Sequence, residues 1–252
     1  AFRRKHKRPR RGYSKPPAEL VVLTLILVAR NEQKLKQQQA ALQETYHVAV
    51  RYIVQDLTQE SAAGLIMADI DKWKVTIDVL VNNAGFNECG FFVDTSLDRE
   101  LEMINMHIRF VTELTKRILV HMKENGYGRI LNVGSTGSFI PSPTDAVYSA
   151  TKAYIMSFSN VLCGELGKAG IKVTTLCPGA TETEFAVKAN IQNALLFRIA
   201  VMKPEKVVGI AYRKMMKGRR LVIPGIYNKL LVVFSKVMPI SLTNRITILM
   251  MK

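Results

Sequence analysis

Short apolar segments alternate with longer amphipathic segments along most of this chain, and this alternation restricts its fold more than any other feature. The apolar segments have the length of strands and are apolar at consecutive positions, which is typical of strands buried on both faces. The segments between them have the length of helices. Strands that alternate with helices predict a parallel sheet covered by helices on each side. We therefore expect a doubly wound α/β domain.

The order of the expected elements predicts where a ligand site lies. The expected strands cover residues 21–29, 48–54, 77–81, 129–133, 173–177 and 220–223. The expected helices begin after Asn31 and then cover residues 61–73, 97–125, 145–168 and 206–216. Ligands bind at the carboxyl ends of the strands in such sheets, so the residues after each strand are the candidates. A chain of 252 residues suits one such domain, residues 20–252, preceded by an atypical basic segment, residues 1–19.

Charge is concentrated at the two ends of the chain, although the whole carries a net charge of +16. Residues 1–15 hold eight basic and no acidic residues, and residues 187–252 hold thirteen basic residues and Glu205. Basic ends are typical of solvated surface, of nucleic-acid contact or of contact with an anionic membrane. Few aromatic residues interleave with the basic ones near the start, which argues against nucleic acid. Peripheral membrane contact stays open as an alternative.

The remaining composition indicates a reduced, cytoplasmic setting. No run approaches the roughly 18 apolar residues of a membrane span, and no signal-peptide core follows the basic start. Three cysteines, odd in number and far apart, do not suggest a disulfide framework. The four histidines show no ligand spacing, so we assign no metal.

A tyrosine and a lysine are spaced to work together after the fourth expected strand. Tyr148 and Lys152 lie four positions apart, on one face of an expected helix. An ordinary tyrosine has a pKa of about 10, and a neighbouring ammonium lowers that pKa. Tyr148 can then give a proton to a carbonyl or take one from an alcohol. Ser135, directly after the strand, can hydrogen-bond the same oxygen.

Several further motifs stand in a recognisable order at the expected strand ends. They are Asn82-Asn83-Ala84-Gly85, Asn105, Ser135, Tyr148 with Lys152, and Pro178-Gly179 with Thr183. This order resembles the classical short-chain dehydrogenases/reductases over about residues 20–252. Residues 27–31, 148–154 and 177–185 are similar to a bacterial branch of that family. The resemblance implies a Rossmann-like fold and an oxidoreductase that interconverts a carbonyl and an alcohol, in the class EC 1.1.1.-.

The resemblance also implies a role for each matching residue. Tyr148 matches the catalytic acid and base, and Lys152 matches the residue that holds the nicotinamide ribose and lowers the tyrosine pKa. Ser135 matches the residue that orients the carbonyl, and Asn105 matches the one that holds a relay water. The expected cofactor-binding positions are Arg30, Asp56, Leu57, Asn83, Ala84, Gly85, Tyr148, Lys152, Pro178, Gly179 and Thr183. Several of these positions also have a purely structural interpretation as a turn, a cap or a surface charge.

Arg30 sits where this family distinguishes between its two cofactors, at the end of the strand 21–29. An acidic residue there binds a free ribose hydroxyl, whereas a guanidinium suits a 2′-phosphate. We therefore expect NADP(H), with NAD(H) as the weaker alternative. The resemblance further implies a homo-oligomer. Its likeness to 3-oxoacyl reductases suggests an acyl or other lipophilic substrate, closed over by residues 182–203, which include the apolar Ala194, Leu195, Leu196, Phe197, Ile199 and Ala200.

One motif of the family is missing from this chain. The family opens with a strand and Thr-Gly-x-x-x-Gly-x-Gly, whose glycines let the backbone approach a pyrophosphate. Here Gly12 is the only glycine before Gly64, and prolines interrupt the same stretch. We expect the first strand and the glycine-rich loop to be absent or disordered. The length is right, so a reading-frame error near the start of the coding sequence is one hypothesis.

Two alternatives to an active enzyme therefore stand beside the main interpretation. The first is a chain derived from the family whose dinucleotide site is defective, whether inactive or mis-framed. The second is a basic membrane-surface binding protein. Residues 227–251 mix apolar side chains with Lys229, Lys236 and Arg245, and this stretch can lie on a bilayer, cover the substrate pocket or form a subunit interface.

Overall fold

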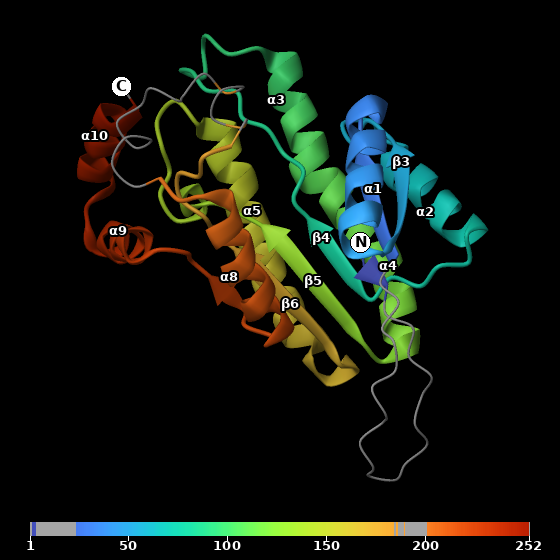
Figure 1. Ribbon diagram of the computed structural model, residues 1–252. Coiled ribbons are helices and arrows are strands. Elements are labelled where there is room, and N and C mark those ends of the chain that lie inside the picture. Colours follow the sequence, from blue (N-terminus) through green and yellow to red (C-terminus); the bar gives the residue numbers. More distant parts are fainter. Residues whose placement is uncertain (1, 4–23, 184, 186–188, 190–200, 252) are drawn as a thin grey trace.

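The computed structural model describes residues 2–3, 24–183, 185, 189 and 201–251, and Figure 1 shows their arrangement. One sheet of seven strands runs through the molecule in the order β3-β2-β1-β4-β5-β6-β7. The strands are β1 (Phe2–Arg3), β2 (Thr24–Ala29), β3 (Ala49–Val54), β4 (Val79–Asn82), β5 (Gly128–Val133), β6 (Ile171–Leu176) and β7 (Leu221–Val222). The pairs β2–β3, β4–β5, β5–β6 and β6–β7 are parallel, as the alternating pattern predicts.

The centre of the sheet differs from the expected arrangement. The family's first strand would lie at this position, and we expected it to be absent or disordered. The structure instead has a two-residue strand, β1, between β2 and β4. It runs antiparallel to both neighbours, with Phe2 opposite Leu25 on one side and opposite Val79 on the other. Two residues of the basic segment thus connect the two halves of the sheet. Residues 4–23, where the glycine-rich loop would fall, lie outside the described residues.

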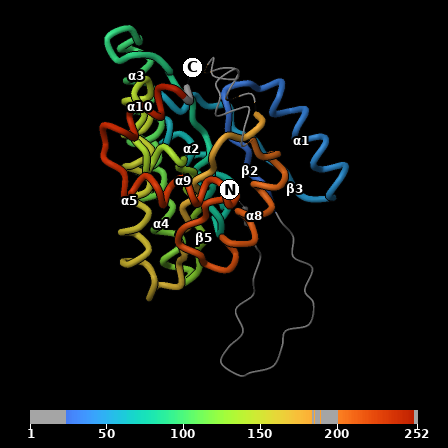
Figure 2. Tube along the Cα trace, turned by 90° about the vertical axis from the view of Figure 1, so that its left-hand side faces the viewer, coloured from blue at the N-terminus to red at the C-terminus, as the bar shows by residue number. Residues whose placement is uncertain are grey.

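Helices cover both faces of the sheet, as Figures 1 and 2 show. The helices α2, α4 and α5 lie on one face, and α1 and α8 lie on the other. The bounds are α1 (Glu32–Tyr46), α2 (Ala62–Lys72), α3 (Leu97–Ile104), α4 (Val111–Asn125), α5 (Ala146–Leu166), α8 (Pro204–Met216), α9 (Ile226–Val237) and α10 (Ile240–Met251). The described residues also form three short helical turns, η1 (Asn105–Phe110), η2 (Thr136–Ser138) and η3 (Gly167–Ala169).

Local sequence signals explain several helix ends. Asn31 caps α1, where its side chain accepts a hydrogen bond from Lys34 N at 2.8 Å. Pro204 stands in the first turn of α8, where its missing N–H costs nothing. Gly126 ends α4 with a left-handed φ of 62°, a conformation that favours glycine. The long helix expected over residues 97–125 is continuous, but its middle, η1, is a π-helix.

Apolar packing divides into two clusters, one on each face of the sheet. The larger cluster joins the sheet to α2, α4 and α5 through residues such as Ile66, Ile118 and Ile130, each 2% exposed or less. The smaller cluster packs α8 against β5 and β6, with Val207 and Met215 against Leu131. Both clusters hold the parallel strands rigidly, so the residues at the strand ends have fixed positions.

Candidate active site

A cavity of about 430 Å³ opens at the carboxyl ends of β4, β5 and β6. Most of the residues singled out from the sequence meet in its wall, although they come from four different segments of the chain. Those that line it are Asn83, Ala84, Gly85, Ser135, Tyr148, Lys152, Pro178, Gly179 and Thr183. Parallel strands place their carboxyl ends at one edge of a sheet, which is why these segments converge.

The serine, tyrosine and lysine form the polar end of this cavity. Helix α5 places Tyr148 and Lys152 one turn apart, and Lys152 Nζ lies 5.5 Å from the centre of the Tyr148 ring. Lys152 is buried and its Nζ donates a hydrogen bond to Val133 O at 3.0 Å. The Ser135 side chain is close enough to Tyr148 to lower its pKa, and its Oγ accepts from Gly137 N at 3.1 Å. The three side chains therefore face a common space.

Hydrogen bonds around η2 fix the position of this group. Ser138 Oγ donates to Lys152 O at 2.8 Å and accepts from Ser135 N at 3.2 Å. Gly134 N donates to Leu176 O at 2.8 Å, and Thr136 N donates to Pro178 O at 2.9 Å. The loop after β5 is thus tied both to α5 and to the loop after β6. Fixed donors and acceptors of this kind preorganise a site.

Burial sets the protonation of the tyrosine and the lysine. Burial of the hydroxyl raises the pKa of Tyr148 well above its ordinary value, although the nearby Ser135 side chain acts in the opposite direction. Burial lowers the pKa of Lys152 to about 8. Near neutral pH Tyr148 is therefore a phenol that can donate a proton, and Lys152 is mostly cationic. The resemblance implies that Lys152 lowers the pKa of Tyr148, but burial is the largest cause of the shift and raises that pKa.

The structure adds a histidine that the sequence analysis considered only as a metal ligand. His107 is 1% exposed and lies on η1, with its ring centre 6.0 Å from that of Tyr148 in an edge-on arrangement. Its Nδ1 lies 2.9 Å from Thr151 Oγ1, and that hydroxyl donates to Tyr148 O at 2.8 Å. Thr151 Oγ1 must then accept from His107 Nδ1–H, so the lone pair is on His107 Nε2.

The environment of His107 keeps its ring neutral. Burial, with the charge of Lys152 as the second cause, holds the pKa of His107 well below its ordinary value. Its Nε2 is buried and has no hydrogen-bond partner among the described residues. The same atom faces Gly85, where a Cβ would come within 2.6 Å of it. Only glycine fits at this point of the cavity wall.

An asparagine in the wall is paired with a carboxyl behind it, and the sequence analysis missed both residues. Asn87 lines the cavity two residues after Gly85, and its Nδ2 donates to Asp145 Oδ1 at 2.8 Å. Burial raises the pKa of Asp145, and the hydrogen bond from Asn87 acts against that rise. Asn87 Oδ1 is buried without a partner among the described residues. The position of Asn87, two residues after the Asn-Asn-Ala-Gly motif, was the sequence feature that could have identified it as a cavity residue.

Four of the expected site residues do not line the cavity. Asn105 lies on η1, two residues before His107, and is half-buried. The side chain of Leu57 is 6% exposed and packs in the larger apolar cluster, so it faces the core. Arg30 and Asp56 follow the neighbouring strands β2 and β3, and Arg30 Nη1 lies 3.8 Å from Asp56 Oδ2.

The ion pair between Arg30 and Asp56 is at the surface. The side chain of Arg30 is 62% exposed, so a ligand can reach its guanidinium. Burial alone would raise the pKa of Asp56, but hydrogen bonds from Thr58 and the charge of Arg30 together lower it. The pair lies beyond the described cavity wall, at the same edge of the sheet.

Two buried asparagines support the site from behind. Asn82 Nδ2 donates to Asn132 Oδ1 at 2.8 Å, and Asn132 Nδ2 donates to Ser159 Oγ at 2.8 Å. Asn82 Nδ2 also donates to Thr115 Oγ1 at 3.1 Å. These bonds join β4 and β5 to α4 and α5 through groups that are satisfied in the dry interior. Asn82 is therefore a structural residue, whereas Asn83 lines the cavity.

The segment expected to close over the substrate is described only in part. Thr183 and Phe185 line the cavity, and the Phe185 ring centre lies 5.9 Å from that of Tyr148. The apolar residues named between 194 and 200 lie outside the described residues.

The residues present fit the nicotinamide half of a dinucleotide. Gly85, Gly134 and Gly179 line the cavity; a neighbouring side chain leaves no room for a Cβ at Gly85 and Gly179, and a Cβ at Gly134 would be tightly packed. The wall therefore presents bare backbone, which a flat ring and a ribose can approach closely. Lys152, Ser135, Tyr148 and Thr183 supply the donors and acceptors that suit ribose hydroxyls and a carboxamide.

Several known proteins are similar to this chain in sequence or in fold. The chain is 37% identical over 175 residues to an uncharacterised short-chain type dehydrogenase/reductase of Sinorhizobium fredii, covering 68% of each chain. It is 32% identical over 168 residues to the very-long-chain 3-oxoacyl-CoA reductase of Macaca fascicularis, covering 65% of this chain and 53% of that protein. Among solved structures, a short-chain dehydrogenase from Sphingobium yanoikuyae in complex with NADPH superposes with a TM-score of 0.75 and 28% identity, covering 85% of each chain.

The fold, the cavity at the strand ends and these similarities agree with a family model that spans most of the chain. Residues 22–194 match the model of the short chain dehydrogenases. This family consists of oxidoreductases that bind nicotinamide cofactors, and its fold is the Rossmann-like α/β sheet described above. The chain belongs to the short-chain dehydrogenase/reductase family.

Proposed function

We propose that this protein is an NADP(H)-dependent oxidoreductase that interconverts a carbonyl and an alcohol. The observation that carries the proposal is the convergence of Ser135, Tyr148 and Lys152 at one end of the cavity. A bound nicotinamide supplies the hydride when a carbonyl is reduced and accepts it when an alcohol is oxidised. The chain's own residues then have to bind the substrate oxygen and move one proton.

Each of the three residues has a distinct part in that proton transfer. The Tyr148 hydroxyl donates its proton to the carbonyl oxygen, which develops negative charge as the carbon receives hydride. The Ser135 hydroxyl donates a hydrogen bond to the same oxygen and holds it beside Tyr148. The Lys152 ammonium stabilises the phenolate that forms on Tyr148 and hydrogen-bonds the ribose hydroxyls. Because Tyr148 is protonated near neutral pH, the arrangement favours reduction of the carbonyl.

His107 is proposed as a positioning residue for Tyr148. The family resemblance gave the supporting role on this helix to Asn105, which does not line the described cavity. His107 instead contacts the Tyr148 ring, and its hydrogen bond to Thr151 holds the turn of α5 that carries Tyr148. Its free Nε2 lone pair can accept from a donor such as water, the function that the resemblance gave to Asn105.

Arg30 supports the choice of NADP(H) over NAD(H). Its guanidinium is mostly exposed at the end of β2, and a planar guanidinium binds a phosphate in a bidentate manner. The similar protein from Sphingobium yanoikuyae was solved with NADPH. Asp56 next to Arg30 orients the guanidinium and does not replace it as the phosphate ligand.

For the substrate we propose a lipophilic carbonyl compound such as a 3-oxoacyl thioester. Phe185, Val207 and Val208 give one side of the cavity an apolar wall. The similar protein from Macaca fascicularis is named a very-long-chain 3-oxoacyl-CoA reductase. The chain spans about half the length of that relative, so the substrate is part of the proposal.

A second candidate function is supported by the centre of the sheet. The two-residue, antiparallel β1 is not the strand that leads into a glycine-rich loop in this family. A protein that keeps the catalytic residues but binds the dinucleotide weakly would be an inactive relative. Measurement of NADPH binding separates the two candidate functions.

The test is NADPH binding to the purified chain by calorimetry, followed by turnover of 3-oxoacyl thioesters of short and long chain. We expect micromolar binding that Arg30→Glu weakens and Tyr148→Phe leaves unchanged. Tyr148→Phe should lower kcat by about 10²–10⁴, the usual contribution of a general acid. Arg219→Glu, an equal charge change at an exposed position before β7, is the matched control. A folded chain that does not bind NADPH would favour the inactive relative.

A further inference from the structure

The last two helices form one edge of the molecule, as Figures 1 and 2 show. Helix α9 is fixed to the scaffold through its inner face. Asn228 and Val232 are buried there, and Asn228 packs against Gly179 so closely that no Cβ fits between them. Asn228 Nδ2 also donates to Pro224 O at 2.7 Å. The position of α9 is therefore set by the loop that follows β6.

The outer face of α9 is as apolar as its inner face. Ile226, Leu230, Val233 and Val237 recur every three or four residues and form one stripe, and they are between 50% and 77% exposed. Helix α10 continues this apolar surface. The α9–α10 surface consists of these four residues together with Phe234, Ile240, Leu242, Ile246 and Leu249, all of them exposed.

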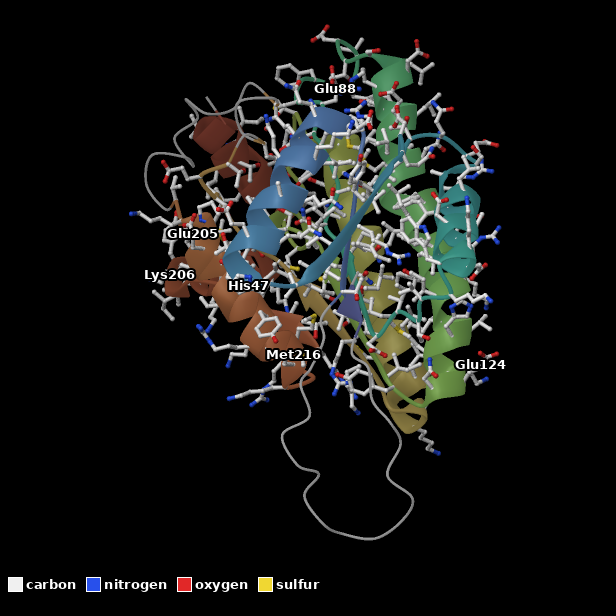
Figure 3. All side chains as sticks on the ribbon, turned by 45° about the vertical axis from the view of Figure 1, so that its right-hand side comes forward. His47, Glu88, Glu124, Glu205, Lys206 and Met216 are labelled. Carbon is white, nitrogen blue, oxygen red and sulfur yellow. The ribbon has the colours of Figure 1, made fainter. Side chains whose placement is uncertain are left out.

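Basic residues border the α9–α10 surface. Lys229, Lys236 and Arg245 are exposed, and none of them forms an ion pair within the described part of the chain. Glu205, labelled in Figure 3 at the start of α8, is the last acidic residue of the sequence. Ten basic residues follow it. The apolar surface is thus bordered by positive charge alone.

A cavity of about 350 Å³ lies beneath the α9–α10 surface. Its wall is almost entirely apolar and includes Tyr227 and Leu231 of α9, Ile246 of α10, and Met238 between the two helices. Ile140, which also lines it, lies five residues after Ser135 in the chain. Lys236 Nζ lies 6.0 Å from the ring centre of the neighbouring Phe139. The space is suited to an apolar chain and adjoins the loop that carries Ser135.

We propose that the α9–α10 surface binds the surface of an anionic lipid bilayer. Amphipathic helices that lie in a membrane interface have this combination of exposed large apolar residues and bordering lysine or arginine. None of the described helices has an apolar stretch long enough to cross a bilayer. Acyl chains fill the apolar cavity, and lipid phosphates pair with Lys229, Lys236 and Arg245.

A second copy of the chain fits this surface less well. A two-fold interface brings each surface patch against the same patch of the partner, or close to it. Lys229, Lys236 and Arg245 would then approach their own copies with no acidic residue in α9 or α10 to pair with. Like charges brought together across an interface oppose association, whereas anionic headgroups neutralise them.

The test is flotation of the full chain with vesicles, in the absence of cofactor and substrate, so that it is independent of the proposed reaction. Vesicles of phosphatidylcholine alone are compared with vesicles of equal parts phosphatidylcholine and phosphatidylglycerol. We expect binding to the anionic vesicles only. Val233→Glu combined with Val237→Glu should reduce that binding by at least about tenfold, because two charges enter the apolar face. Val120→Glu with Val161→Glu is the matched control, since these valines are 56% and 57% exposed on α4 and α5.

Each other outcome would overturn the proposal. If both double variants lose binding equally, or if neither loses it, vesicle binding belongs to another part of the chain, such as the basic residues 1–15. No binding to either vesicle would also reject it. In that case light scattering distinguishes the alternatives, since a dimer that only Val233→Glu with Val237→Glu converts to a monomer would assign the surface to a second copy.

Discussion

Lys152 shows how a single residue acquires its properties from its surroundings. The sequence places it one helical turn from Tyr148, and the fold then buries it against β5 with Nζ hydrogen-bonded to Val133 O. Burial disfavours the ammonium and lowers its pKa to about 8. The charge of Lys152 is therefore retained at neutral pH but is lost a little above it.

The first prediction follows from that pKa. Lys152 is cationic below pH 8 and neutral above it, whereas Tyr148 keeps its proton through the same range because its pKa is raised. We expect kcat/KM for carbonyl reduction to be constant below pH 8 and to fall about tenfold per pH unit above it, since this parameter reports the free enzyme. Thermal unfolding at each pH is the control for loss of structure. A profile that stays flat to pH 10 would contradict the assignment of Lys152.

His107 and Asn105 show what the fold adds to motif matching at the residue scale. Both lie on η1, two positions apart, and the family resemblance pointed to Asn105. On a π-helix the angle between successive side chains differs from that of an α-helix, so helical spacing alone does not identify the inward residue. The packing of η1 against α5 places His107 beside Tyr148.

At the scale of elements, η1 and the loop after β4 make a tight contact at the cavity wall. Gly85 lies against His107 Nε2 so closely that a Cβ would come within 2.6 Å. The ring cannot move away easily, because its Nδ1 is held by Thr151 on α5. Three elements thus meet at one buried side chain.

The second prediction tests this meeting point. Gly85→Ala should lower the free energy of unfolding by about 1–3 kcal/mol, the usual cost of overpacking, as measured by urea denaturation. Combining it with His107→Ala should cost less than the sum of the two single changes, because the clash is then absent. Gly64→Ala on α2, where nothing lies within 4 Å, is the control and should be neutral or stabilising. Strict additivity would show that the two residues do not touch.

At the scale of the whole molecule, β1 joins two groups of parallel strands into one sheet. Strands β2 and β3 pair with each other, and β4 to β7 form the other parallel group. Only β1 pairs with both β2 and β4 within the described chain. Without it, backbone groups at the centre of the sheet would lose their partners.

The third prediction concerns this connection. A chain that lacks residues 1–3 should show faster hydrogen exchange at the amides of β2 and β4 that face β1, by about tenfold for each lost hydrogen bond. The amides of β6, which is paired on both sides by β5 and β7, serve as the internal control. Unchanged exchange in β2 and β4 would mean that β1 contributes nothing to the sheet.

The order of strands and helices, the family and most of the cavity wall follow from the amino-acid sequence alone. Apolar periodicity reports burial directly, and the motifs at residues 82–85, 135 and 178–183 stand at strand ends whose positions follow from a parallel sheet, while residues 148–152 lie on the helix that follows β5. Tertiary structure decided what depends on contacts between distant segments. Asn87 meets Asp145, His107 meets Gly85 and Tyr148, and β1 enters the sheet against the direction of its neighbours. Such contacts depend on packing between elements, and no local pattern in the chain encodes them.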